Sequence, residues 1–462
     1  TAYLRLTLRI RWPLAGAYLA GCAGLLWLLL PRVGTEIFPV VDAGQFQVRL
    51  REPAGTRIER TERLTLEAME LIRETVGADH IQITTSFIGV QPASYPINTI
   101  YLWTSGPHEA VLLVALKPEA KLRGEALKEE LRARFRRRMP RVTISFEAAD
   151  IVARVTSFGS HTPVEVAVQG PNQAQNRAHA EKVRTELAKL PFLRDLQYSQ
   201  PLDYPTLQID IDRDRAGQYG LSAAGVARSL VAATSSSRFV EPNFWRDPAS
   251  GNAFQVQVEL PQHQMSSLEE LRALPVAPGS ARVLLGDVAS IKPVKSPGLV
   301  ERYNMQRVVS LTANISGVAL GQVVTDIQKV IDRAGQPPRG STVAVRGQIP
   351  ALRETIAGLE LGLGLAIIAI FLLLAANFQS FRLGVAVIST VPAVLVGVLV
   401  MLLATGTTLN VQSFMGAIMA TGIAVANSIL LVTFAEFSRR SGSSVVGAAI
   451  EGGSGRLRAI LM

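Results

Sequence analysis

The chain has 462 residues, of which 48% are hydrophobic, and its formal net charge is +10. So long and apolar a chain exceeds what one small soluble core needs, which excludes a single soluble domain and suits several domains with membrane-spanning segments. The basic charge does not indicate nucleic-acid binding, because the densest basic cluster, residues 132–141, contains one aromatic side chain for base stacking, Phe135. We therefore expect no nucleic-acid partner.

Cysteine and histidine are sparse in this sequence. The single cysteine, Cys22, lies in an apolar run near the N-terminus, so no disulfide is expected in the remainder of the chain. The five histidines are scattered without the spacing that metal ligands show. The sequence therefore predicts neither a metal site nor a cofactor.

The first predicted element is an apolar run at residues 14–30. It follows three arginines, Arg5, Arg9 and Arg11. Since about 20 apolar residues in a helix cross a bilayer, we expect a transmembrane helix at residues 13–31 and a cytoplasmic flank at residues 1–12. A cleaved signal peptide is the alternative, because a basic flank and a short apolar core resemble one, although no small-residue cleavage site follows.

A strand–helix–strand pattern occurs twice after this span. Strict alternation of polar and apolar residues predicts strands, and a period near 3.6 predicts helices. The two units are strand 45–51, helix 58–75 and strand 80–87, then strand 111–117, helix 125–138 and strand 142–146. Two such units make a split-βαβ sandwich, with helices on one face of an antiparallel sheet. We expect the first sandwich over residues 42–149.

The pattern then begins again and is interrupted. The predicted elements are strand 164–168, helix 173–189 and strands 195–198 and 206–212, and then, much later, strand 307–314, helix 320–333 and strand 341–345. A second sandwich is therefore expected in two pieces, residues 162–212 and 299–348. The intervening residues 213–298 form a predicted insert. Its own elements are a helix that opens at Ser222 and strands 254–260, 282–285 and 288–291.

The C-terminal third of the chain is membrane-like. Residues 361–435 contain one charged side chain, Arg382. Three spans are predicted here, at residues 356–376, 383–404 and 413–435. Pro392 is predicted to kink the middle one.

The distribution of arginines predicts the orientation of these spans. Arginines flank one set of span ends, namely Arg5, Arg9, Arg11, Arg382, Arg439 and Arg440. By the positive-inside rule these ends are cytoplasmic. The large region between the first and second spans is then expected in the periplasm of a bacterium.

Four stretches carry a resemblance to a known family. They are GTEIFPVVDAGQFQVRLREPAGT (34–56), LQIDIDRDRAGQYGLSAAGVARSL (207–230), LGDVASIKPVKSPGLVERYNMQRVVSLTANISG (285–317) and GIAVANSILLVTFAEF (422–437). With the order of one span, two split sandwiches and three spans, they make the chain similar to the C-terminal half of a resistance–nodulation–division (RND) efflux pump of the acriflavine-resistance type. The last eight residues, GRLRAILM, fit the amphipathic segment before that family's eleventh helix.

The resemblance implies an α+β membrane protein with four spans like the family's helices seven to ten. It implies periplasmic split-βαβ (ferredoxin-like) porter subdomains at 42–149 and at 162–212 with 299–348, and an inserted docking or funnel subdomain at 213–298. Residues 441–462 become a cytoplasmic amphipathic segment, and the chain becomes a fragment that ends before helix eleven. The implied activity is proton-driven efflux of small amphipathic or hydrophobic compounds across the inner membrane, by a secondary transporter and not an enzyme. The implied partners are a homotrimer, a periplasmic adaptor and an outer-membrane channel.

Polar residues inside the last span are candidates for a proton relay. Asn427 and Thr421 lie in mid-membrane, where polar groups are costly enough to suggest a function. Many drug-exporting relatives have a lysine before the matched asparagine, and here that position is Ala426. The alternative for both residues is helix packing, because asparagine and threonine also hydrogen-bond between helices. The resemblance places the proton-carrying carboxylates outside this chain.

A ridge of small residues on the same span is predicted to admit a neighbouring helix closely. Its members have i, i+4 spacing and are Gly416, Ala420, Ala424 and Ser428.

Aromatic residues between the two halves of the first sandwich are candidates for a substrate pocket. They are Phe87, Tyr95, Tyr101 and Trp103, in a stretch rich in proline and glycine. Aromatic walls with few polar groups suit apolar or amphipathic ligands. The alternative is that these side chains form the sandwich core.

Three further functions remain open at this point. Met401, Met415 and Met419 suggest a metal-exporting RND relative, although methionine also fills irregular helix interfaces. A membrane-anchored periplasmic sensor or ligand-binding protein without transport is a second alternative. The lack of a recognisable cytoplasmic signalling domain argues against it. A periplasmic enzyme is the third, for which no Ser–His–Asp, paired-carboxylate or metal cluster is found.

Overall fold

A computed structural model describes residues 7–8, 10–39, 44–90, 102, 104–149, 151–261, 264–277 and 283–461, without the side chains of 151–153 and 456–461. The chain divides into two compact units. One contains residues 1–200 with 299–462, and the other is residues 201–298.

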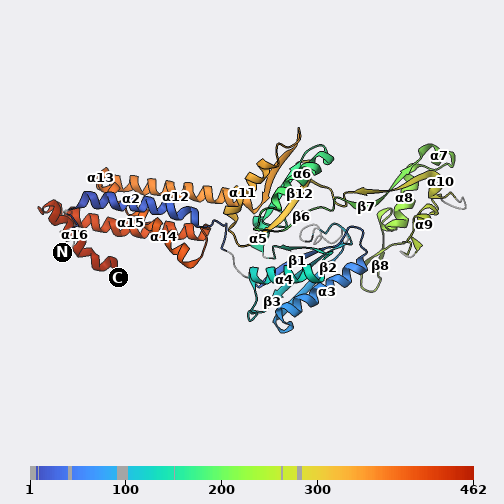
Figure 1. Cartoon of the computed structure of the whole chain (residues 1–462), viewed down its shortest axis with the longest axis horizontal. Coiled ribbons are helices and arrows are strands. Elements are labelled where there is room, and N and C mark those ends of the chain that lie inside the picture. The colour runs from blue at the N-terminus through green and yellow to red at the C-terminus, as the bar shows by residue number, and fades with distance from the viewer. Residues whose placement is uncertain are drawn as a thin grey trace. The chain divides into compact units, whose positions relative to one another are not determined.

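The first sandwich has the predicted split-βαβ topology (Figure 1). Its elements are β1 (Gln45–Arg51), α3 (Ile58–Val76), η2 (Ala78–His80), β2 (Ile81–Ile88), β3 (Glu109–Leu116), α4 (Gly124–Arg138) and β4 (Thr143–Glu147). The sheet is antiparallel in the order β2-β3-β1-β4. Val48 pairs with Leu112 on one side and Phe146 on the other, and both helices cover this apolar face through Leu71, Leu131 and Phe135.

The second sandwich repeats this topology. After α5 (Ile151–Thr156), its elements are β5 (Val164–Gln169), α6 (Gln173–Leu187), β6 (Leu193–Tyr198), β11 (Glu301–Tyr303), β12 (Gln306–Ile315), α11 (Leu320–Arg333) and β13 (Thr342–Gly347). β12 lies beside β5, as predicted, with β13 on the other side of β5. β6 and β11 both pair with β12.

One predicted strand of this sandwich belongs elsewhere. β7 (Tyr204–Ile211) pairs with β10 (Ala289–Ser296) inside the unit of residues 201–298. Ile209 lies opposite Ile291, and both pack against the core of that unit. The predicted pieces 162–212 and 213–298 are therefore wrong at their shared boundary, which lies near residue 201. Alternation identified the strand correctly but does not specify its partner.

The unit of residues 201–298 has a small core of its own. Its other elements are α7 (Arg213–Gln218), α8 (Ala223–Thr234), η4 (Ser237–Phe239), β8 (Asn243–Arg246), β9 (Ala253–Val256), α9 (Leu268–Arg272) and α10 (Leu285–Val288). Ser222 caps α8 by accepting from the Gly225 amide, as the predicted helix start requires.

Two strands predicted in this unit differ from the structure. The strand expected at 254–260 ends at Val256. The strand expected at 282–285 is wrong within the described residues, because Leu284 makes an isolated bridge with Pro275 and a helical turn follows. The Asp287 carboxylate accepts from the Leu284 amide and so favours that turn.

Among the described residues, four helices are long and apolar enough to cross a membrane. They are α2 (Arg11–Leu29) continued by η1 (Leu30–Arg32), α12 (Gln348–Phe378), α13 (Phe381–Ile388) followed by α14 (Val391–Thr405), and α15 (Val411–Arg440). α14 contacts α2 and α15, and α15 also contacts α16 (Val445–Leu461) at the end of the chain (Figure 1). The expected effect of Pro392 is present as a break, because α13 ends at Ile388 and the proline lies in the first turn of α14.

Candidate functional site

Strand β1 is buried on both faces, and this creates an unusual polar site. Apolar Phe46, Val48 and Leu50 alternate along β1 with Gln47, Arg49 and Arg51. The apolar set packs beneath α3 and α4. The polar set lies on the opposite face, where Gln47 and Arg49 are 2% and 3% exposed. Buried charges require partners, since an isolated one is strongly unfavourable.

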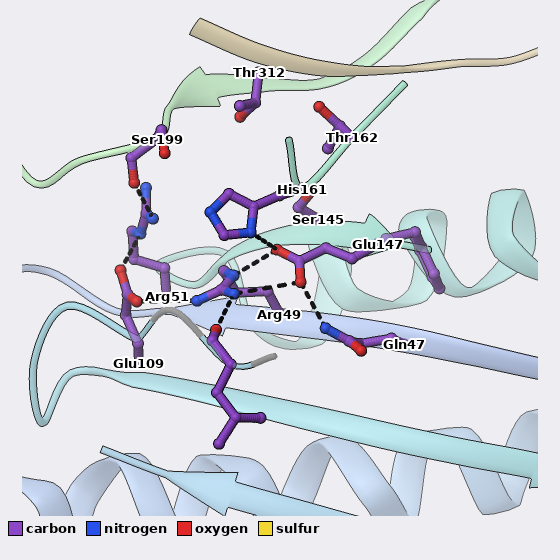
Figure 2. Close-up of polar contacts among 12 residues, drawn as sticks. Gln47, Arg49, Arg51, Glu109, Ser145, Glu147, His161, Thr162, Ser199 and Thr312 are labelled. Atoms are coloured by element: carbon purple, nitrogen blue, oxygen red, sulfur yellow. Dashed lines mark hydrogen bonds and ion pairs between the residues drawn. The ribbon is translucent and has the colours of Figure 1, made fainter. Parts of the chain in front are cut away.

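The partners of Arg49 include two carboxylates and a backbone carbonyl, and Figure 2 shows its position beside Glu147. Its Nε donates to Glu147 Oε1 at 2.5 Å and its Nη1 to Glu109 Oε2 at 3.2 Å. Its Nη2 donates to the carbonyl of Leu102. The Gln47 side-chain amide donates to the second Glu147 oxygen at 2.6 Å. Such a network withstands burial because its members satisfy one another.

Glu109 is held ionised. Arg51 Nε donates to Glu109 Oε1 at 2.6 Å, and the amide and hydroxyl of Ser105 donate to the carboxylate. Burial alone would raise the pKa of Glu109, but Arg51, Arg49 and the Ser105 donors outweigh burial and lower that pKa to about 2. Burial would likewise raise the pKa of Glu147, but the attraction of Arg49 outweighs burial and lowers that pKa. We call Gln47, Arg49, Arg51, Glu109 and Glu147 the charge cluster.

The charge cluster also contacts the second sandwich. Arg51 Nη1 donates to the Tyr198 carbonyl at 2.7 Å, and its Nη2 donates to the Ser199 carbonyl at 2.8 Å. Both acceptors lie at the end of β6. One arginine therefore joins Glu109 of the first sandwich to the backbone of the second.

A second polar contact joins the sandwiches around Asp195 of β6. The Arg132 guanidinium of α4 donates to both Asp195 oxygens, at 3.0 and 2.9 Å. The Phe146 amide of β4 and the Asn314 side chain of β12 also donate to Asp195. Asp195 has φ of +54° and lies where the pairing of β6 with β12 shifts register. The contacts from Arg132 and Phe146 hold the two sandwiches together across a polar face, and the Asn314 contact fixes Asp195 within the second sandwich.

A small cavity adjoins the charge cluster. It has a volume of about 10 Å³, room for roughly one water molecule, and its lining includes Arg49, Glu147 and His161. His161 Nδ1 lies 3.9 Å from Glu147 Oε1. Burial lowers the pKa of His161 to about 4 despite the nearby Glu147 carboxylate, so the imidazole is neutral near pH 7. The cavity is too small for an organic substrate.

The predicted aromatic pocket is only partly described. Phe87 lies on the edge strand β2, half-buried and opposite Val111. Tyr95, Tyr101 and Trp103 lie outside the described residues. The grouping of these four side chains therefore stays a prediction.

The charge cluster was missed by sequence reasoning. The signal was the alternation of Gln47, Arg49 and Arg51 with large apolar residues. Acidic residues at the ends of β3 and β4, Glu109 and Glu147, completed it.

The relay candidates lie on different faces of α15. Thr421 is 2% exposed on the buried stripe that also includes Phe414, Ala417 and Val425. Its hydroxyl is buried without a hydrogen-bond partner in the described part of the chain. Asn427 is half-buried, and no hydrogen bond of its side chain is found among the described residues.

The predicted small-residue ridge lies beside that stripe and not on it. Gly416 is exposed, with nothing within 4 Å of the position that a Cβ would take. Ala420, Ala424 and Ser428 are half-buried, and the Ser428 hydroxyl donates to the Ala424 carbonyl at 2.9 Å. A close helix on this ridge therefore stays a prediction.

The whole chain is similar to known transport proteins. A sequence model of the AcrB/AcrD/AcrF family matches residues 1–462. The cobalt-zinc-cadmium resistance protein CzcA of Cupriavidus metallidurans is 25% identical over 93% of the chain and 40% of the relative. The multidrug/solvent efflux pump membrane transporter MepB of Pseudomonas putida is 26% identical over 98% of the chain and 42% of the relative.

A solved structure is also similar. The crystal structure of a heavy metal efflux pump (crystal form II) matches 100% of the chain and 46% of that protein, with a TM-score of 0.82 and 22% identity. The chain spans about two fifths of the length of the two relatives named above.

Proposed function

We propose a transport function on the premise that the chain belongs to the AcrB/AcrD/AcrF family, whose sequence model matches residues 1–462. That match over the whole chain is the observation that carries the proposal. The chain is part of an RND efflux permease and not an enzyme. The finer proposal is proton-driven efflux of small amphipathic or hydrophobic compounds, by a homotrimer in the bacterial inner membrane that works with a periplasmic adaptor and an outer-membrane channel.

The proposed orientation places both sandwiches and residues 201–298 in the periplasm. Support comes from Arg439 and Arg440 at the end of α15 and from Arg382 at the start of α13. In a Cys22→Ala background, an impermeant thiol reagent should label Tyr219→Cys in intact spheroplasts and should label Arg440→Cys only after permeabilisation. The reverse labelling pattern contradicts this orientation.

The proposed energy coupling involves α15. Its buried Thr421 hydroxyl and its half-buried Asn427 amide are donors without partners among the described residues. In a membrane such groups need partners, which we place on helices that the longer relatives possess. A carboxylate there would take up and release protons, and nearby donors would adjust its pKa. Residue 426 is alanine where many drug-exporting relatives have a lysine, so Asn427 is the nearest side-chain donor that α15 offers at this depth in the membrane.

The proposed substrate path runs along the first sandwich. Polar contacts at Arg51 and Asp195 join the two sandwiches, and the adjoining cavity of about 10 Å³ has room for roughly one water molecule. A substrate that enters here must therefore separate these contacts. The predicted aromatic residues Phe87, Tyr95, Tyr101 and Trp103 would then receive its apolar parts.

Export by a complete transporter that contains this chain tests the proposal. The transporter, its adaptor and its channel are placed in a bacterium that lacks its own RND pumps. Resistance to amphipathic compounds should rise, and a protonophore should abolish the gain. Unchanged resistance with normal membrane insertion contradicts the proposed substrate class.

Metal export is the second candidate, because CzcA is named for cobalt, zinc and cadmium resistance. Met415 and Met419 lie one turn apart on α15 and are 58% and 67% exposed. Soft thioether ligands suit some transition metals. No group of three or more His, Cys, Asp or Glu that could hold a metal is found in the described part of the chain. Resistance to cobalt, zinc or cadmium without resistance to amphipathic compounds would favour this candidate.

A further inference from the structure

A short extended segment after the first span contacts two helices that are distant in the sequence. This segment, residues 34–37, is called the joint segment below. It lies between η1, which ends the first span, and the first sandwich. Its neighbours are the loop that leads into α15 and the start of α11 in the second sandwich.

The joint segment pairs with the loop before α15. Thr35 forms a parallel bridge with Leu409, in which the Glu36 amide donates to the Leu409 carbonyl at 3.0 Å and the Leu409 amide donates to the Gly34 carbonyl at 2.8 Å. The Thr408 hydroxyl donates to the Glu36 carboxylate at 3.0 Å. The Ile37 carbonyl accepts from the amide of Val411, the first residue of α15, at 3.2 Å. One of the free amides at the start of α15 is thereby satisfied.

The same segment also contacts the start of α11. The Thr35 carbonyl accepts from the Gly321 amide, in the first turn of α11, at 2.9 Å. The approach is close enough to require glycine on both sides. A Cβ at Gly321 would overlap the Thr35 hydroxyl, and a Cβ at Gly34 would lie 2.5 Å from the Ala319 Cβ. Carbonyls of the joint segment therefore accept hydrogen bonds from amides at the starts of both α11 and α15.

Apolar side chains anchor the two ends of this segment in different cores. Val33, just before it, is 5% exposed and packs with Leu399 of α14, Leu409 of the following loop and Phe414 of α15. Ile37 is 8% exposed and belongs to the core of the second sandwich. Hydrogen bonds and packing thus fix the segment on both sides, and neither side can shift without disturbing the other.

We propose that the joint segment transmits movement of α15 to the second sandwich. This inference rests on the proposed function, in which α15 carries the relay candidates. The second sandwich already has a covalent connection to the membrane, because β13 ends at Gly347 and α12 begins at Gln348. The joint segment adds a non-covalent connection to a different membrane helix. It stays closed during transport, and displacement of the start of α15 displaces the start of α11.

A size-exchange experiment tests the close contact. In the complete transporter, Gly34→Ala should lower export per assembled trimer by about tenfold, because its methyl group overlaps the Ala319 Cβ and separates the two sides. Proton uptake in the absence of substrate should persist, since α15 is unchanged, but its stimulation by substrate should be lost, because coupling between two sites is reciprocal. Ala319→Gly alone should export normally, because glycine is accepted at the N-cap of α11. The double variant should recover export, since the overlapping Cβ is gone. Normal export by Gly34→Ala, or failure of the double variant to recover, overturns the proposal.

Hydrogen exchange on the chain itself gives a readout that does not require transport. Gly34→Ala should speed exchange at both the Gly321 and the Val411 amides, which lie on opposite sides of the joint segment. If exchange becomes faster at just one of these two amides, the proposal that the joint segment transmits movement is overturned. If the wild-type transporter shows no proton-dependent export, the proposed function fails, and this exchange measurement still decides whether the connection exists.

Cross-linking tests whether the joint segment stays closed. In a Cys22→Ala background, Glu36→Cys and Thr408→Cys are joined by a short reagent that reacts with two thiols. Export should equal that of the same variant without reagent, because the two residues keep their distance throughout transport. Loss of export on cross-linking shows that the contact must open and overturns the proposal.

Discussion

Two polar regions of this protein differ in how their groups are satisfied. In the charge cluster between the sandwiches, Arg49 bonds Glu109, Glu147 and a backbone carbonyl, and Arg51 bonds Glu109 and two more carbonyls. On α15, the Thr421 hydroxyl and the Asn427 amide have no partners among the described residues. Buried polar groups in native proteins are nearly always bonded. The charge cluster is therefore satisfied by residues of the chain and holds the sandwiches together, whereas for the α15 groups we propose partners outside the chain.

Removal of Arg49 should give the largest effect. Arg49→Met leaves Glu109 and Glu147 buried with less compensating charge, so the free energy of unfolding of the sandwiches should fall by about 3–5 kcal/mol. Denaturant unfolding of the purified chain in detergent measures this change. Arg134→Met is the matched control, because Arg134 pairs on the surface with Glu130 and is 42% exposed. Equal, small losses in both variants would contradict the structural importance of the charge cluster.

Replacement of Asn427 tests the opposite case, in which the partner lies outside the chain. Asn427→Leu should lower export per assembled trimer by about tenfold or more, because the proposed carboxylate loses a donor. The stability of the chain should change little, since no described residue bonds the Asn427 side chain. Ile423→Leu is the control, because Ile423 is 62% exposed on the same helix and keeps its volume. Packing alone would instead alter stability by about 0.6 to 2 kcal/mol and leave normalised export intact.

The contrast between the regions also marks what the sequence can predict. Local patterns located the four spans and most elements of both sandwiches, though not α5 or β11, because alternation and helical period depend on neighbouring residues. The partner of β7 was not predictable in this way. Its alternation fits the sheet of β5 as well as that of β10, and only long-range packing of Ile209 against Ile291 decides between them.

The charge cluster was hidden for a related reason. Arg49 and Glu147 are 98 residues apart, and their contact depends on the pairing of β1 with β4. A strand with arginines on alternate positions normally indicates a solvated face. Here a second sandwich covers that face, which no local pattern indicates. For α15 the sequence identified polar residues in mid-membrane. Their proposed partners are not among the described residues, so the proposed role of these residues stays a prediction.

Acid should weaken the sandwiches through His161. Burial depresses the pKa of this imidazole from 6.5 to about 4, so below pH 6.5 the unfolded chain takes up a proton that the folded chain does not. The free energy of unfolding therefore decreases as the pH is lowered, by about 1 kcal/mol from pH 6.5 to pH 5.5 from this residue alone. The difference in that free energy between wild type and His161→Gln, measured at both pH values, isolates the effect. A difference that does not change with pH contradicts a buried neutral imidazole. Glu109, with a pKa lowered to about 2, adds a loss only below about pH 4.5.

Ser428 gives the smallest expected effect and separates the two regions most sharply. It lies one residue after Asn427, but its hydroxyl donates to the Ala424 carbonyl of its own helix at 2.9 Å. A hydroxyl whose hydrogen bond is satisfied within its own helix offers little to a neighbouring helix. Ser428→Ala should therefore change the free energy of unfolding by less than about 0.5 kcal/mol and leave export normal. The small side chain also keeps the predicted ridge of Gly416, Ala420 and Ala424 open to a neighbouring helix. Export per assembled trimer is measured beside Asn427→Leu in the same strain. A loss for Ser428→Ala as large as that for Asn427→Leu would show that hydrogen bonding inside the chain does not distinguish structural from functional polar residues on this helix.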